Sequence, residues 1–229
     1  PSSSPVKGTM TDGIWGDAAD QIWIDKNGNR FVNEYAERDV LAKASLALDK
    51  GIFYIIYAGR GDRNNPTQLL KGVEMDPRLQ GMLDGGHIWV GSTLAELAEA
   101  SKTPAAGTAP AFTEEALRAT IEKYNTYVLN QHDDDFGKEV ISGAIDLAAF
   151  EADPNTYIAI SPRKSSLHHT MGGVTIDAQT RVLREDGTVI QGLWAAGEVT
   201  GGIHGGNRLG GNAIADIFTF GQIAGRNAA

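Results

Sequence analysis

The chain has 229 residues, of which 41% are hydrophobic and 21% charged, a composition typical of a soluble globular protein with one or two domains. Its net charge of −9 argues against a surface for nucleic acid or an anionic membrane, which needs clustered Lys and Arg. It contains no Cys, which excludes disulfides, thiolate catalysis and Cys-bound metal, and no run near the ~18 apolar residues of a membrane span.

The first residues, Pro1-Ser2-Ser3-Ser4-Pro5, are neither a signal peptide nor a Met start. We therefore expect the chain to begin inside a longer polypeptide, with residues 1–19 as a linker and the end of a preceding segment.

The first half alternates strands and helices. Residues 20–34 predict a β-hairpin around an Asn-Gly turn. Apolar spacing predicts a helix over residues 37–50, which Gly51 ends. Residues 53–57 predict a short buried strand, and residues 60–90, rich in Gly and Asn, predict loops.

The middle of the chain is mainly helical. A capping box opens a short helix over residues 93–100, and residues 101–110 predict a linker. Thr113 is expected to cap a helix over residues 114–130, whose apolar stripe indicates a core face. The acidic residues 133–135 favour a solvated loop at the helix end over a metal site.

The last third returns to strands. Residues 157–160 and 174–176 predict strands, and a turn at Asp186-Gly187 predicts a hairpin over residues 182–190. Residues 193–196 predict a buried strand that ends at Gly197-Glu198, and an apolar helix is expected from about Asn212 to Arg226.

Three glycine-dense segments in this last third, residues 168–173, 192–202 and 204–214, alternate with His, Glu, Arg and Asn. Glycine lets backbone amides approach a flat or anionic ligand closely. A carboxylate past a strand end, as at Glu198, suits a sugar or ribityl hydroxyl. Arg208 offers a fork for a substrate carboxylate, and His168 offers a second donor. Together these residues indicate a redox or ligand site.

The usual dinucleotide fingerprint, Gly-x-Gly-x-x-Gly after a first strand, is absent. Gly59-Arg60-Gly61 follows an apolar strand, but it lacks the third glycine and a following helix. We therefore expect the adenosine pyrophosphate of a dinucleotide to be bound outside this chain.

The three glycine-dense segments resemble, in order and spacing, the C-terminal part of the soluble fumarate reductase flavoproteins, which are relatives of succinate dehydrogenase flavoprotein and urocanate reductase. A weaker similarity covers residues 20–40, which resemble the start of that family's mobile capping domain. The implied fold class is α+β, a capping (clamp) domain over residues 20–160 followed by the C-terminal portion of an α/β FAD-binding domain over residues 161–229. The capping module is expected to have one core of its own, around Phe53, Ile55, Leu117, Ile121 and Tyr124.

The resemblance implies an FAD enzyme that reduces a carbon–carbon double bond conjugated to a carboxylate, with hydride from flavin N5 and a proton from Arg38. No metal is implied. The substrate ligands implied are His168, Thr170, Gly206 and Arg208. The flavin contacts implied are His169, Gly197, Glu198, Arg208, Leu209, Gly210, Gly211, Asn212, Ala213 and Ile214. The partners implied are a small unsaturated carboxylate, an N-terminal FAD-binding segment missing from this chain, and an electron-donor domain with haem or FMN.

One stretch departs from the family pattern. The family has a Glu and an Arg upstream of the hairpin that relay the proton, whereas this chain reads Thr11-Asp12-Gly13-Ile14-Trp15-Gly16-Asp17 and lacks the Arg. Asp12 or Asp17 is a candidate substitute, and a second substrate-binding His of the family has no match. These differences favour an unsaturated carboxylate other than fumarate, such as an aryl or imidazole acrylate. Two alternatives remain, a flavin-free capping fragment without activity and the reverse reaction of a succinate dehydrogenase-like or aspartate oxidase-like enzyme.

Overall fold

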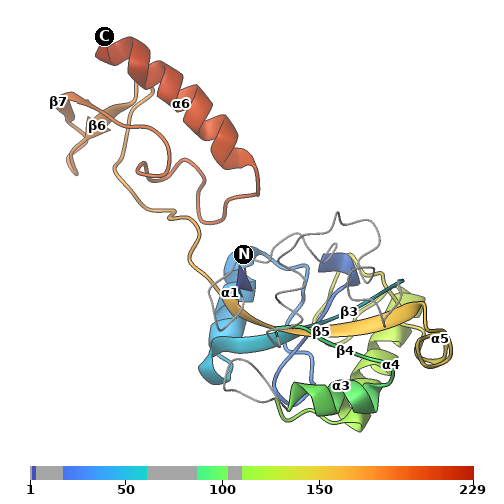
Figure 1. The fold of residues 1–229 in the computed structure, drawn as a ribbon. Helices are drawn as coiled ribbons and strands as arrows, with labels where there is room; N and C mark the ends of the chain where they lie inside the picture. The colour runs from blue at the N-terminus through green and yellow to red at the C-terminus, as the bar shows by residue number, and fades with distance from the viewer. Residues whose placement is uncertain (1, 4–17, 61–86, 103–109) are drawn as a thin grey trace. The chain divides into compact units, whose positions relative to one another are not determined.

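A computed structural model describes residues 2–3, 18–60, 87–102 and 110–229 of the chain. The chain forms two compact units, Pro1–Ser166 and Leu167–Ala229 (Figure 1). Strand β5 runs from Thr156 to Ser165, so it crosses the domain boundary that the sequence suggested after residue 160. Asp12 and Asp17 lie outside the described residues.

An antiparallel sheet is the centre of the first unit. Strands β3 (Ile52–Arg60) and β5 (Thr156–Ser165) pair along nine positions, from Ile52 opposite Lys164 to Arg60 opposite Thr156. Strand β2 (Ile22–Ile24) pairs with β3, and both β1 (Ser2–Ser3) and β4 (Trp89–Gly91) pair with β5. Strand β4 begins at Trp89, so the prediction of loops alone over residues 60–90 was wrong at its end. Residues 61–86 lie outside the described part of the chain.

Two helices of this unit begin after a threonine whose side chain caps the first turn. Helix α3 (Leu94–Ser101) starts after Thr93, and α4 (Glu114–Asn130) after Thr113; both threonine side chains accept a backbone N–H. These two predicted starts are confirmed. The helix predicted over residues 37–50 is α1 (Arg38–Leu46) followed by a 3₁₀ turn, Asp49–Gly51. A further 3₁₀ turn, Ala18–Asp20, and the short helix α5 (Leu147–Ala152) were not predicted.

The sheet has an apolar cluster on each face, because side chains alternate along each strand. Ile52, Tyr54 and Ile56 of β3 pack with residues of α3 and α4, which include Leu117, Ile121 and Tyr124. Phe53 and Ile55 belong to the opposite cluster, with Ile88, Tyr157 and Ala159. The prediction that these five residues share one core is therefore wrong, because Phe53 and Ile55 lie on the other face of the sheet from Leu117, Ile121 and Tyr124.

The second unit contains a hairpin and a long helix. Strands β6 (Arg181–Leu183) and β7 (Val189–Trp194) form the predicted hairpin, and helix α6 covers Asn212–Ala228. Residues 174–176 form only two isolated bridges, Val174 with Thr200 and Ile176 with Val182, instead of the predicted strand. The prediction of a buried strand at residues 193–196 was wrong, because β7 ends at Trp194 and Leu193 is 45% exposed.

Apolar side chains also remain exposed on α6, where Ile214, Ile217 and Phe218 are 59%, 44% and 73% exposed. No helix in the described ranges is both long enough and apolar enough to cross a bilayer.

Candidate functional site

Backbone hydrogen bonds join two of the glycine-dense segments. The N–H of Val174 donates to the carbonyl of Val199 at 2.9 Å, and that of Gly201 donates to the carbonyl of Val174 at 3.0 Å. A Cβ atom on Gly201 would lie 2.6 Å from the backbone nitrogen of Gly173, so a larger residue would separate the two backbones. The glycines at this crossing are needed for the close approach of residues 173 and 199–201.

Glu198 links the same two segments through its carboxylate. Its Oε1 accepts from the backbone N–H of Thr170 at 2.9 Å and lies 3.4 Å from the Thr170 hydroxyl. Its Oε2 lies 3.6 Å from Nδ1 of His169. The hydrogen bond from Thr170, with a smaller contribution from His169, holds the pKa of Glu198 below its usual value. The side chain is 52% exposed, so the ionised carboxylate remains accessible to a ligand.

The third glycine-dense segment leads into helix α6. Gly211 stands at the N-cap with φ of 87°, and a Cβ added there would meet no atom within 4 Å. Arg208 is half-buried; one terminal nitrogen donates to the carbonyl of Leu209 at 3.4 Å. Its Nε is buried and has no hydrogen-bond partner among the described residues. The segment thus contains a buried donor without a partner in the described part of the chain, four residues before the first residue of α6.

The remaining predicted site residues of this unit lie at or near the surface. His168 and Gly206 are exposed, His169 is half-buried and Gly197 is buried. The flavin-contact candidates that open the helix are mostly exposed, namely Leu209, Gly210, Gly211, Asn212 and Ile214, with Ala213 half-buried. Within this unit the structure brings together His169, Thr170 and Glu198.

Arg38, the predicted proton donor, lies in the other compact unit. It is the first residue of α1 and is exposed. Its neighbour Asp39 forms an exposed ion pair with Lys43 at 2.8 Å. The guanidinium of Arg38 is therefore accessible at the beginning of a helix.

The sequence did not predict a buried ionic cluster in the first unit. Arg30 donates to both oxygens of Glu34, at 2.9 and 2.8 Å, and to both oxygens of Asp133, at 3.0 and 2.9 Å. The side chain of Arg30 is 4% exposed and both carboxylates are fully covered. Burial opposes the charge on Arg30, but the hydrogen bonds to Glu34 and Asp133 raise its pKa. The prediction of a solvated acidic loop was therefore wrong for Asp133.

Lys138 completes this cluster. Its Nζ lies 3.5 Å from Glu34, and it donates to the carbonyl of Gln21 at 3.0 Å and to the hydroxyl of Tyr124 at 2.8 Å. Burial lowers the pKa of Lys138, and Glu34 partly offsets this effect. The only sequence signal was the Arg30–Glu34 spacing, since Asp133 and Lys138 come from a distant part of the chain.

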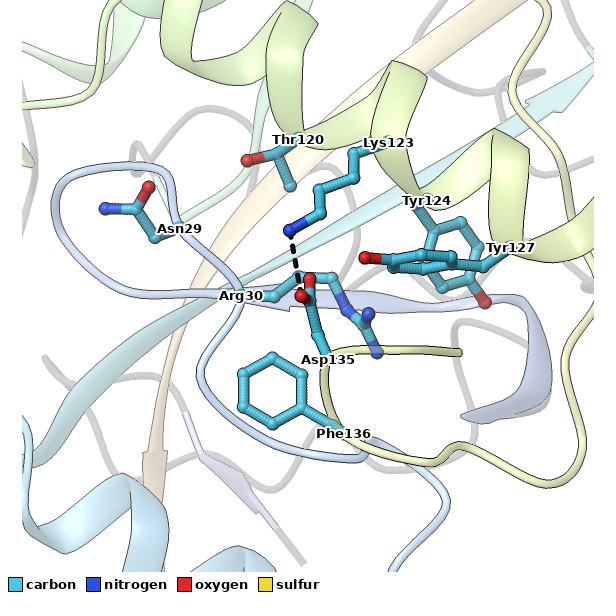
Figure 2. A pocket seen from close by; sticks show the side chains of 8 residues that line it. All are labelled: Asn29, Arg30, Thr120, Lys123, Tyr124, Tyr127, Asp135 and Phe136. Carbon is cyan, nitrogen blue, oxygen red and sulfur yellow. Dashed lines mark hydrogen bonds and ion pairs between the residues drawn. The ribbon is translucent and has the colours of Figure 1, made fainter. Parts of the chain in front are cut away.

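A pocket of about 310 Å³ lies beside the cluster (Figure 2). Figure 2 shows Arg30 between aromatic side chains, with the Lys123–Asp135 ion pair of 2.8 Å nearby. The lining residues are Asn29, Arg30, Thr120, Lys123, Tyr124, Tyr127, Asp135 and Phe136. None of them belongs to the predicted catalytic, substrate or flavin set. Among the described residues, no group of three or more His, Asp or Glu side chains is arranged to hold a metal.

Comparison with known proteins places these observations in a family. The family model described as "FAD binding domain" matches residues 3–214. NADH:acrylate oxidoreductase of Vibrio harveyi is 40% identical over 228 residues, which are all of this chain and 20% of that protein. Urocanate reductase of Eggerthella lenta is 36% identical over 208 residues, 91% of this chain and 31% of that protein.

The solved open conformation of a flavocytochrome c3 fumarate reductase is similar to the whole chain, with a TM-score of 0.59 and 32% identity, and the match covers 35% of that structure. The chain therefore spans between about a fifth and a third of the length of these relatives. The resemblance to fumarate reductase flavoproteins is confirmed, and the chain belongs to the FAD binding domain family.

Proposed function

We propose that the protein carrying this chain is an FAD-dependent reductase of a carbon–carbon double bond conjugated to a carboxylate. The observation that carries the proposal is the meeting of glycine-dense segments around Thr170 and Glu198, close in sequence to an Arg208 with a buried, unsatisfied Nε. Relatives named for acrylate and urocanate support the substrate class, since both are unsaturated carboxylates.

The residues present fit FAD by their chemistry. The ring system of a flavin is planar, and its pyrimidine edge gains negative charge on reduction, so this edge needs close backbone donors. Gly206 and Gly211 leave open the space that a Cβ would fill, and α6 begins directly after Gly211. Glu198 offers an accessible acceptor for a hydroxyl group. In this assignment His169, Gly197, Glu198 and residues 208–214 hold the cofactor.

When bound, the flavin would supply a hydride to one alkene carbon. The chain's own residues then have two tasks. Arg208 and His168 bind the substrate carboxylate, and the positive charge of Arg208 with the hydrogen-bond donor of His168 stabilises the negative charge that develops as the double bond is reduced. Thr170 and Gly206 are assigned to the same substrate carboxylate. Arg38 donates a proton from its guanidinium to the other alkene carbon, so that two electrons and two hydrogens are added in all.

An Arg side chain is a weak acid in water because its reference pKa is above 12. Arg38 is exposed in this structure, so the proposal requires that substrate binding remove it from solvent. Residues 20–160 would act as the capping domain that closes over the substrate. Asp12 or Asp17 would return the proton to Arg38.

The direct test is to purify the full-length protein and record its visible spectrum and its products. We expect bound FAD, and reduction of acrylate, urocanate or fumarate under reducing conditions without oxygen. A purified, folded full-length protein without flavin would overturn this proposal. Faster oxidation of succinate than reduction of fumarate would instead favour the reverse reaction.

A further inference from the structure

His204 and Asp216 form a covered pair in the second unit. Nε2 of His204 lies 3.2 Å from Oδ2 of Asp216, and the side chains are 13% and 3% exposed. His132 and Asp134 in the first unit are separated by the same 3.2 Å, but both of their side chains are 73% exposed. The two pairs thus share chemistry and distance and differ in burial.

The covered pair connects two parts of the candidate site. His204 begins the segment that carries Arg208, whereas Asp216 lies in the first turns of α6. The ring of His204 also meets the ring of His169 nearly edge to face, with centroids 5.7 Å apart and an interplanar angle of 69°. His169 in turn lies beside Glu198. Contacts therefore run from Asp216 through His204 to His169.

The burial of Asp216 lowers the stability of the folded chain, so stability alone does not explain it. Its Oδ1 is buried and has no hydrogen-bond partner among the described residues, so His204 is the partner of only one oxygen. A buried carboxylate with incomplete hydrogen bonding costs free energy of folding. The segment that it holds contains Gly205 and Gly211, both with positive φ, and glycine gives the free chain extra freedom.

We infer that His204, held by Asp216, is a positioning residue for His169 and for the segment that carries Arg208. This inference rests on the proposed function, because it assigns the pair a role in the flavin and carboxylate site. His204 does not itself need to touch the substrate. Its ring contact restricts the flavin-contact residue His169, and its hydrogen bond restricts the segment that carries the substrate ligand Arg208.

The test compares His204→Ala, His204→Phe and Asp216→Asn in the full-length, FAD-loaded protein. Acrylate is the probe, with its Kd measured by calorimetry, its KM by steady-state kinetics and its kcat expressed per bound flavin. We expect His204→Ala to raise Kd and KM about tenfold, within the range of effects that indirect contacts transmit. Asp216→Asn should have a smaller effect, because an amide can still form a neutral hydrogen bond.

His204→Phe keeps an aromatic ring beside His169 but cannot bond to Asp216. If the Ala variant fails to fold, a raised Kd and KM for acrylate in the Phe variant supports the inference, and unchanged values contradict it. His132→Ala and Asp134→Asn are the matched controls and should leave both constants unchanged. A role in folding alone would lower the melting temperature and the flavin content but leave the Kd and KM of the flavin-loaded protein unchanged, and that result would overturn the inference. A wild-type protein without flavin would instead overturn the proposed function, and this inference with it.

Discussion

Arg30 and Asp133 are 103 positions apart in the sequence and are joined by two hydrogen bonds, of 3.0 and 2.9 Å. Arg30 forms a β-bridge with Ile24 of β2 across a turn, and Asp133 comes from the loop after α4. The side chain of Asn33 also donates to the carbonyl of Gly137 at 3.3 Å. These hydrogen bonds therefore connect the segment that leads to Arg38 with the loop after α4.

The first prediction concerns this ion pair. Asp133→Ala should destabilise the protein by about 3–5 kcal/mol, because it leaves the buried Arg30 with one carboxylate partner in place of two. Chemical denaturation measures the loss. The matched control is Lys43→Ala, which removes an exposed ion pair and should change the stability little. Equal effects of the two variants would contradict the structural role of the cluster.

The second prediction follows from the pKa of Asp133. Burial opposes ionisation of this carboxyl, but the hydrogen bonds from Arg30 outweigh burial and hold its pKa below the usual 3.8. Ionised Asp133 therefore contributes stability above pH 3.8, and this contribution is lost as the pH falls toward the lower folded pKa. Denaturation curves between about pH 3 and 7 should show the loss in the wild type and a weaker pH dependence in Asp133→Asn. An unchanged pH dependence in that variant would exclude Asp133 as a source.

The third prediction tests Arg38 as the proton donor. Arg38→Lys should abolish turnover while flavin absorbance and substrate binding remain, because an ammonium group cannot reproduce the geometry of the guanidinium fork. Steady-state kinetics in the full-length protein provide the measurement. A variant that keeps more than about a tenth of the wild-type kcat, a loss under ~1.4 kcal/mol, would show that Arg38 is not the acid.

The fourth prediction concerns the substrate carboxylate. Arg208→Ala should weaken binding of a carboxylate inhibitor by about 2–5 kcal/mol, because the carboxylate would lose a charged, bidentate partner. Titration calorimetry measures the affinity. Arg226→Ala is a suitable control, since Arg226 lies in the last turn of α6, the helix that follows Arg208 in the chain, and is exposed. An affinity that does not change in Arg208→Ala would remove Arg208 from the site.

The fifth prediction concerns the exposed apolar face of the second unit. Ile214, Ile217 and Phe218 on α6 lie 44–73% exposed, and Leu193 on β7 is 45% exposed. An exposed apolar surface of this kind is typically buried against further protein or a second copy of the chain. In flavin-free protein, limited proteolysis should therefore cut residues 167–229 before the first unit. Equal resistance of the two units in a flavin-free monomer would contradict this expectation.

Local signals in the sequence were sufficient for much of the fold. Thr93 and Thr113 predicted two helix starts because a cap acts on amides within the next three residues. The turn at Asp186-Gly187 predicted the hairpin of β6 and β7, because a glycine adopts the positive φ that a tight turn between two strands needs. The glycine-dense motifs predicted the family, since close backbone approaches such as that of Gly173 and Gly201 leave no space for other residues.

Only the tertiary structure decided which distant segments meet. The sequence predicted strands near residues 53–57 and 157–160 but not that they pair, nor that Phe53 and Leu117 lie in different clusters. Arg30 with Asp133, and His204 with Asp216, are ordinary charged or polar residues when read alone. Their burial depends on how helices and loops pack, and a single sequence has no local signal for that packing. The composition, caps, turns and motifs were therefore determined by the sequence alone, whereas the buried ionic cluster and the His204–Asp216 pair became visible only in the folded chain.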